Sequence, residues 1–404
     1  MIAAFGKNGD IETAFALIDE MKTKGLRLSE DTFSHLLMAC ISDKQSGFRL
    51  ALSVYRQLLA RKCQPDLHTF HLILRAVRDC GPGSANVNDL ILEALTSREV
   101  RKFKANLSPK LIEASKESND EDTIEESDDK APKVVLVEDK SLVPSPVEVP
   151  NLLSPKPKID LVIGLNSESL NSPGARLALL GDVQGFLGIL EQEFELKPDI
   201  KIFSLLLNIV QDNPEKELIV LEHFKSSTCR PDVDFFNQLI RIRARRKEFE
   251  NARNVLDLMV EAGLNPDIVT FGCLALCCDK QSKINQMLQD MKTYEVVPNC
   301  QIMTSLIFNC KSPRIMLRIL KITSNLNVEV DEKMMQQIEK FRVKYQAKVR
   351  QFEVKGSSPN GGKVDLEAWT EFCDYYSNWL RKTEVSITKD PWLQFKTKRD
   401  LKIK

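Results

Sequence analysis

The amino-acid sequence predicts an all-α protein, an α-solenoid of stacked helix-turn-helix repeats. A Pro-Asp or Pro-Asn pair recurs along the chain, and its last four occurrences are separated by 33, 35 and 32 residues. Between these pairs, apolar residues follow the i, i+3, i+4, i+7 spacing of helices that bury one stripe. Because two short helices cannot bury their stripes alone, such units must stack on one another. A long acidic insertion interrupts the predicted array, and a helical region caps its end.

The unit over 233–267 shows the pattern of a single repeat. Phe236 and Leu239 lie on the apolar stripe of a first helix, and a second stripe runs over 249–260. Gly263 ends the second helix, since glycine accepts the left-handed backbone found there. Pro266 then prevents the helix from continuing. Each unit is therefore expected to be two helices followed by a proline turn.

The N-terminal block of repeats is predicted over 1–80, with units that begin at Glu30 and Leu67. In the repeat register Met1 falls inside a first helix that lacks its beginning. We therefore expect the chain to be an N-terminally incomplete form of a longer protein. No targeting signal is visible before this helix, and any leader is expected to lie upstream of Met1.

The segment 81–173 is predicted to be a mostly disordered acidic insertion. Between Glu117 and Lys130 it carries eight acidic residues and one lysine. Its Ser, Pro, Glu, Asp and Lys content cannot bury enough apolar area to offset the entropy of ordering. The interrupted repeat resumes near Gly181, so that one repeat spans 67–199 and contains the insertion.

A second block of repeats is predicted over 174–331, with units that begin at Ile200, Val233, Ile268 and Cys300. A helical C-terminal region follows over 332–383, and a basic tail over 384–404. Aromatic residues recur at helical spacing from Trp369 to Trp379. We interpret these aromatic residues as the core of a terminal cap. The alternative is that they form a platform on which bases stack.

Composition excludes several classes of protein. Lys plus Arg equals Asp plus Glu at 57 each, but the acidic insertion makes the remaining chain net positive. No apolar run has the length of a membrane span, and the ten scattered cysteines indicate reduced thiols. The sequence contains no metal-ligand pattern, no glycine-rich nucleotide-binding loop and no motif for a catalytic nucleophile. The sequence predicts a protein that is not an enzyme and has no cofactor or small-molecule substrate.

The unit 233–267 resembles a pentatricopeptide repeat, and so does the run from Gly6 to Leu26. The resemblance extends over several units in register. It implies binding of single-stranded RNA, with one base read per repeat by the fifth and the last residue of each unit. These base-reading candidates are Ser34 with Asp66, His71 with Asp199, Ser204 with Asp232, Asn237 with Asp267, and Thr304 with Asp331. The sixth pair, Gly272 with Asn299, offers only the asparagine.

The family's apolar wedge at the second position is present only as Val269. Cationic residues near the end of the first helix are candidates for phosphate contacts. They are Lys7, Arg241, Arg243, Arg245 and Lys280. The alternative role for the aspartates is helix capping alone, because an Asp before a helix accepts hydrogen bonds from the free N–H groups of its first turn.

The resemblance implies a mitochondrial matrix protein that binds mitochondrial RNA, whether tRNA precursors, rRNA or mRNA, in processing, stability or ribosome assembly. RNA-processing nucleases or mitoribosome components are the protein partners that it implies. The alternative is a tetratricopeptide-like adaptor, or a scaffold inside a ribonucleoprotein complex. The tetratricopeptide signature of Trp, Leu-Gly and Tyr is missing, whereas the Pro-Asp pairs favour RNA.

Overall fold

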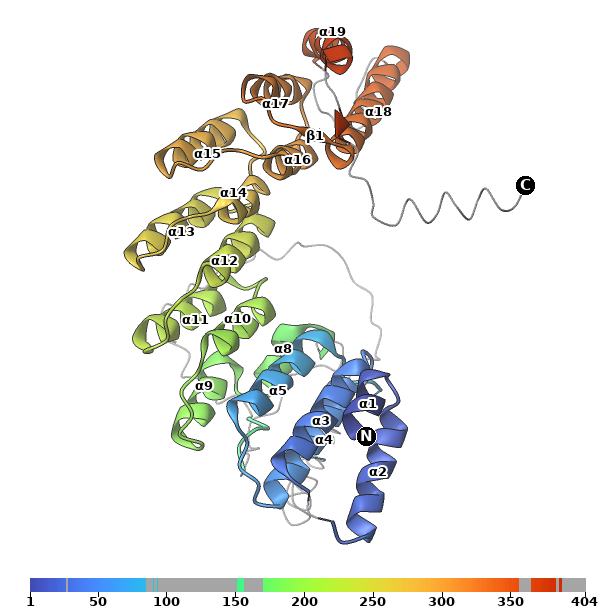
Figure 1. Ribbon diagram of the computed structural model, residues 1–404, viewed down its shortest axis with the longest axis vertical. Helices are drawn as coiled ribbons and strands as arrows, with labels where there is room; N and C mark the ends of the chain where they lie inside the picture. Colours follow the sequence, from blue (N-terminus) through green and yellow to red (C-terminus); the bar gives the residue numbers. More distant parts are fainter. Residues whose placement is uncertain are drawn as a thin grey trace, which may run out of the picture. The chain divides into compact units, whose positions relative to one another are not determined.

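The computed structural model describes residues 1–26, 28–84, 90, 93, 151–155, 170–355, 365–382 and 385–386 (Figure 1). The chain divides into two compact units, Met1–Cys229 and Arg230–Lys404. Both are built from helical hairpins, which confirms the predicted all-α solenoid class. Two short strands, β1 (Val330–Asp331) and β2 (Val385–Ser386), are described besides the helices. No described helix has the length and apolarity needed to span a membrane.

The first unit arranges its helices in two rows. Its hairpins are α1 (Ile2–Lys7) with α2 (Ile11–Thr23), α3 (Glu30–Ser42) with α4 (Gly47–Ala60), and α10 (Ile200–Ile209) with α11 (Pro214–Ser226). The first helices of successive hairpins lie side by side, in the order α1, α3, α5 (Leu67–Asp79), α10 (Figure 1). Chain segments that are far apart in sequence, α5 and α10, are thus neighbours in one row.

The insertion lies inside a single repeat, between its two helices. The partner of α5 is α9 (Asp182–Gln192), which follows the short helix α8 (Pro173–Ala178). The ring of Phe70 on α5 lies 6.0 Å from that of Phe186 and 5.4 Å from that of Phe194. Because α9 completes the hairpin that α5 begins, the row of first helices continues unbroken.

Two parts of the segment 81–173 pack against the repeats, although disorder is predicted for most of it. At 151–155, the hydroxyl of Tyr55 donates to the carbonyl of Leu153 at 2.9 Å, and Arg56 donates to the carbonyls of Leu152 and Ser154. Buried Arg176 on α8 donates to the carbonyl of Val77 at 2.8 Å and also to two carbonyls at 170–171. The acidic run 117–130 lies outside the described residues.

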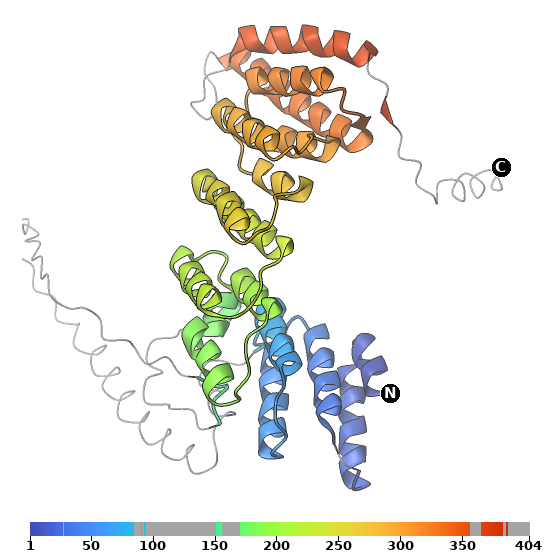
Figure 2. The same ribbon diagram turned by 60° about the vertical axis from the view of Figure 1, so that its left-hand side comes forward.

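The second unit repeats the two-row pattern. Its hairpins are α12 (Val233–Arg245) with α13 (Phe249–Glu261), α14 (Ile268–Ala275) with α15 (Gln281–Thr293), α16 (Cys300–Asn309) with α17 (Pro313–Asn325), and α18 (Glu332–Lys355) with α19 (Leu366–Lys382). The first helices α12, α14, α16 and α18 pack in sequence order, as Figure 2 shows from a second direction.

The core of each repeat is set by the fourth residue of its first helix. This residue is an aromatic or a methionine that is at most 5% exposed, and the set is Phe33, Phe70, Phe203, Phe236, Phe271 and Met303. Burial of such a side chain contributes about 1.5–3 kcal/mol. The apolar stripe read from the sequence is therefore the surface that joins the two helices of a hairpin and neighbouring hairpins.

Several second helices end on a residue with a left-handed backbone. Gly25 and Gly263 adopt φ of 64° and 74°, which glycine does without strain. At the equivalent places Lys62, Glu195, Glu295 and Asn327 have φ of 58°, 55°, 57° and 48°. A side chain with a Cβ adopts this conformation at a cost of about 1 kcal/mol.

The C-terminal hairpin continues both rows of the second unit. Phe341 and Tyr345 on α18 pack against Trp369 and Phe372 on α19, with ring centroids 5.1–5.8 Å apart. The hydroxyl of Tyr376 donates to Glu339 at 2.6 Å. The aromatic stripe is thus the core of a helical cap. After α19, β2 pairs in parallel with β1, and the other tail residues after 386 lie outside the described part.

Candidate nucleic-acid interface

The last residue of each predicted unit caps the first helix of the next. In all six, a side-chain oxygen accepts the backbone N–H three residues on, with distances of 2.7–3.0 Å. The six are Asp66, Asp199, Asp232, Asp267, Asn299 and Asp331. In Asp66 and Asp267 the bonds to described residues all use Oδ1. Their Oδ2 atoms therefore remain as hydrogen-bond acceptors at the start of a first helix.

One predicted pair of base-reading residues meets directly. His71 Nε2 on α5 lies 2.8 Å from Asp199 Oδ1 at the start of α10. Burial would raise the pKa of Asp199, but the hydrogen bonds from His71 and the Ile202 N–H outweigh it, so that the pKa lies below its ordinary value. The fold thus brings the fifth and last residues of a unit together, across the insertion that separates them in sequence.

Asn237, the fifth residue of its unit, is 3% exposed. Neither its Oδ1 nor its Nδ2 has a hydrogen-bond partner among the described residues. A buried amide without partners costs about 1–3 kcal/mol, because it has lost water and gained nothing. Side chains of this kind are rare in folded proteins, and a ligand is one of the partners that explains them.

The other fifth residues differ from one another. The hydroxyl of Thr304 donates to the Cys300 carbonyl of its own helix at 2.8 Å. Ser34 and Ser204 are half-buried, and Gly272 presents no side chain. Sequence reasoning therefore places six residues at one repeat position, but the structure does not give all of them the same environment.

The second positions are all exposed, which identifies the open face of the row of first helices in each unit. They are Asp31, His68, Lys201, Asp234, Val269 and Gln301. Val269, the residue that matches the family's apolar wedge, is 49% exposed. An exposed apolar side chain in this place is free to contact a ligand laid along the first helices.

The cationic candidates are spread over different surfaces. Arg241 is exposed on α12 and lies 3.7 Å from the Cys273 sulfur. Arg243 donates to the carbonyl of Asn251 on α13, whereas Arg245 and Lys280 are exposed. Lys7 ends α1, but its side chain lies outside the described part. Arg241 shares the open face with the second positions, because it is seven residues after Asp234 on one helix.

Sequence reasoning missed an exposed aromatic residue on the same face. Phe308, the ninth residue of its unit, is 70% exposed on α16. The ninth position is polar in three units, as Arg75, Asn208 and Arg241, and apolar in the other three, as Met38, Leu276 and Phe308. Position within the repeat, rather than local hydropathy, would have identified it.

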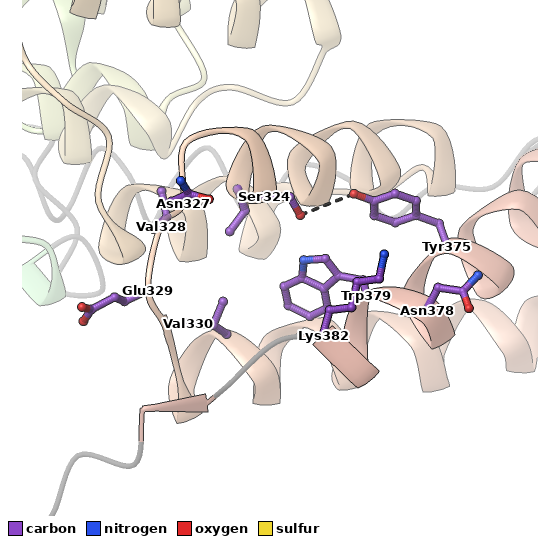
Figure 3. Close-up of a pocket in the computed structure, with 10 residues that line it drawn as sticks. Ser324, Asn327, Val328, Glu329, Val330, Tyr375, Asn378, Trp379 and Lys382 are labelled. Carbon is purple, nitrogen blue, oxygen red and sulfur yellow. Dashed lines mark hydrogen bonds between the residues drawn. The ribbon is translucent and has the colours of Figure 1, made fainter.

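A separate pocket of about 700 Å³ lies beside the C-terminal hairpin (Figure 3). It lies between the end of α17, the following loop and α19, with the indole of Trp379 and the amine of Lys382 among its walls. Tyr375 and Ser324 hydroxyls approach within 3.4 Å across it. The predicted base-reading residues are not part of this pocket. Nor do the described residues contain a cluster of His, Cys, Asp and Glu that could hold a metal ion.

Comparison with known proteins identifies the repeats. A family model described as the PPR repeat family matches residues 1–42, and the Pentatricopeptide repeat domain model matches residues 220–280. The chain thus contains pentatricopeptide repeats in these two segments. This chain is similar to the protein named "Pentatricopeptide repeat-containing protein 1, mitochondrial" from several mammals, and the similarity covers nearly the whole length of this chain.

The rat protein is 29% identical over 440 residues, covering 98% of this chain, and the human protein is 30% identical over 438 residues, covering 97%. The chain spans 62% of the rat protein and 60% of the human one. Among solved structures, maize PPR10 matches at 16% identity with a TM-score of 0.42, over 93% of this chain and 44% of PPR10. PPR10 in complex with an 18-nt psaJ RNA element matches at 15% identity with a TM-score of 0.38, over 92% of this chain and 44% of that one.

Proposed function

We propose that this chain is a non-catalytic RNA-binding protein of mitochondrial RNA metabolism. Single-stranded RNA lies along the first helices, and bases meet the fifth and last residues of successive repeats. The observation that carries this proposal is the contact between His71 and Asp199, 2.8 Å apart. These two repeat positions form one small polar site, and the capping aspartates at the later joints, Asp232, Asp267 and Asp331, place a carboxylate at the equivalent position.

The proposal gives the caps two functions. Oδ1 holds the backbone N–H of the third helical residue, and Oδ2 accepts a hydrogen bond from a base edge. The cap keeps the carboxylate rotamer fixed, so little side-chain entropy is lost when RNA binds. In the repeat of Asn237, the buried amide supplies the second contact after the neighbouring side chains move to admit a base.

The cellular role that we infer is maturation or stabilisation of mitochondrial transcripts, with tRNA precursors and rRNA as the leading substrates and mRNA as the third. The chain binds and shields RNA in the matrix while separate nucleases cut. Two observations support this role: the mitochondrial relatives match the chain over nearly its whole length, and the open face carries hydrogen-bonding side chains in a repeated register.

The test is crosslinking of protein to RNA in cells, followed by sequencing, for the wild type and an Asp232→Asn, Asp267→Asn variant. Asparagine caps a helix as well as aspartate does, so the fold stays and only the group offered to the base changes. The matched control is Asp257→Asn, Asp374→Asn, which removes two exposed carboxylates from second helices of the repeats. We expect mitochondrial transcripts with the wild type, an altered sequence preference with the cap variant, and no change with the control.

Absence of any RNA enrichment with the wild type would refute the proposal and favour a protein adaptor. Enrichment with identical sequence preference in all three proteins would place RNA binding away from the caps.

A further inference from the structure

The longest first helix of the second unit has an exposed face of lysines. Between Lys333 and Arg350, α18 carries six cationic residues and one acidic residue, Glu339. Glu339 is turned toward α19, where it accepts from Tyr376 at 2.6 Å, and it also accepts from Arg342. The lysines on the other side are exposed at Lys333, Lys340, Lys344 and Lys348, and none pairs with a carboxylate among the described residues.

The spacing of these lysines puts them on one face. Steps of seven, four and four residues return to nearly the same side of a helix. A neighbouring side of α18, roughly 110° round the helix at about 100° per residue, is buried in the hairpin through Ile338, Phe341, Tyr345 and Val349. The packed core beside it therefore holds the lysine face in a fixed direction.

This face continues the open face of the repeats. In the repeats of this unit, the exposed second and ninth positions include Asp234 with Arg241, and Gln301 with Phe308. In the unit that begins at Glu332, Lys333 and Lys340 stand at the same two positions. The helix α18 packs beside α16 in the row (Figure 1). It has 24 residues against 10 in α16, so it extends about 36 Å rather than about 15 Å along that direction.

Phe308 is on α16, the helix that packs beside α18. The sulfur of Cys300 at the start of α16 is 3.8 Å from that of Met334 near the start of α18. Because the two helices begin at the same level, Phe308 is level with the turn of α18 that starts at Lys340. An aromatic ring that is 70% exposed and a row of unpaired cations on the neighbouring helix are the two components of a surface for single-stranded nucleic acid.

We propose that α18 and Phe308 form a sequence-independent anchor for single-stranded RNA. The phosphates contact Lys333, Lys340 and Lys344, and one base stacks on the ring of Phe308. The anchor rests on the proposed function, since it holds the part of an RNA that leaves the base-reading repeats. An anionic membrane fits less well, because an interfacial helix inserts an apolar face and that face of α18 is buried in the hairpin.

The test measures the affinity of the full chain for mixed-sequence single-stranded RNA between about 50 and 200 mM salt. Each phosphate contact on a single strand contributes about 0.7 to the slope of log K against log salt. We expect Lys340→Gln, Lys344→Gln to reduce the slope by about 1.4 and to weaken binding equally for all RNA sequences. The control Lys225→Gln, Lys292→Gln removes two exposed lysines at the ends of α11 and α15 and keeps the wild-type slope.

The stacking contact is tested separately. Phe308→Ala lowers affinity about 5- to 150-fold, the range for loss of one base–aromatic stack, and Phe308→Tyr keeps the wild-type affinity. Failure of Phe308→Ala to change affinity would overturn the stacking half of the anchor, and a wild-type salt slope in the lysine variant would overturn its phosphate half.

Two further results separate this inference from the proposed function. If the lysine variant has the wild-type slope while Asp232→Asn, Asp267→Asn still alters sequence preference, the anchor is wrong and base reading stands. If the wild type binds no RNA, both are wrong. Loss of binding to phosphatidylserine vesicles in the lysine variant, with RNA affinity unchanged, would reassign the face to a membrane surface.

Discussion

Replacing Asn237 by leucine is expected to stabilise the protein while impairing its binding site. The side chain is 3% exposed, and both its polar atoms lack partners among the described residues. Leucine has the same branching and the same number of side-chain heavy atoms as asparagine but no polar atoms, so Asn237→Leu removes an uncompensated desolvation cost of about 1–3 kcal/mol. A gain of 1 kcal/mol in a unit of this size raises its Tm by about 2–4 °C.

The assay is thermal and urea denaturation of the full chain, with hydrogen exchange of the α12 amides to locate the effect. The matched control is Asn309→Leu, because the Asn309 amide donates to the carbonyls of Ala275 and Ser305 at 3.4 and 3.2 Å. This control is expected to lose about 0.5–1.5 kcal/mol. The reasoning fails if Asn237→Leu destabilises α12 by more than about 1 kcal/mol, since Asn237 would then have a partner. Weaker RNA binding by the stabilised variant would show that the amide is kept for a ligand.

Three further predictions concern stability. Lys62→Gly and Glu295→Gly each relieve a left-handed backbone (φ 58° and 57°) and raise the free energy of unfolding by about 1 kcal/mol; the control Glu222→Gly, at an exposed position inside α11, lowers it by about the same amount. The pKa of Asp199 is lowered in the folded state, so its stabilisation is complete above the unfolded pKa and is lost as pH falls through the folded one. The difference in unfolding free energy between the wild type and Asp199→Asn is therefore expected to shrink from about pH 5 to pH 3, and a constant difference would contradict it. Arg176→Met leaves the carbonyls of Val77 and Leu170 without their donor and lowers the unfolding free energy by about 3 kcal/mol, whereas Arg75→Met, at an exposed position, changes it little.

The repeat architecture was predictable because its signals are local. Proline, a capping carboxylate and an apolar residue at the fourth position recur within a few residues of each helix start, and these determine where helices begin. Asp66 and Asp267 show this directly, since each caps the helix that the sequence assigned to it.

The candidate site was less predictable because its environment depends on neighbouring repeats. Nothing adjacent to Asn237 in sequence indicates that its amide is buried without a partner. The docking of 151–155 depends on Tyr55 and Arg56, which lie in another repeat. The face of α18 was visible as a row of lysines, but its alignment with Phe308 follows from the packing of α16 against α18.

The position of the insertion also affects how this chain folds. Most contacts in a helical solenoid join residues close in sequence, which favours fast folding. The hairpin of α5 and α9 is different, since its helices end at Asp79 and begin again at Asp182. This connection is longer than a turn of three residues by about five doublings. Closing it therefore costs about 3 kcal/mol more in chain entropy than closing the short turn. We therefore expect this repeat to form last, templated by finished neighbours, and the insertion to change length in evolution without shifting the register of the row.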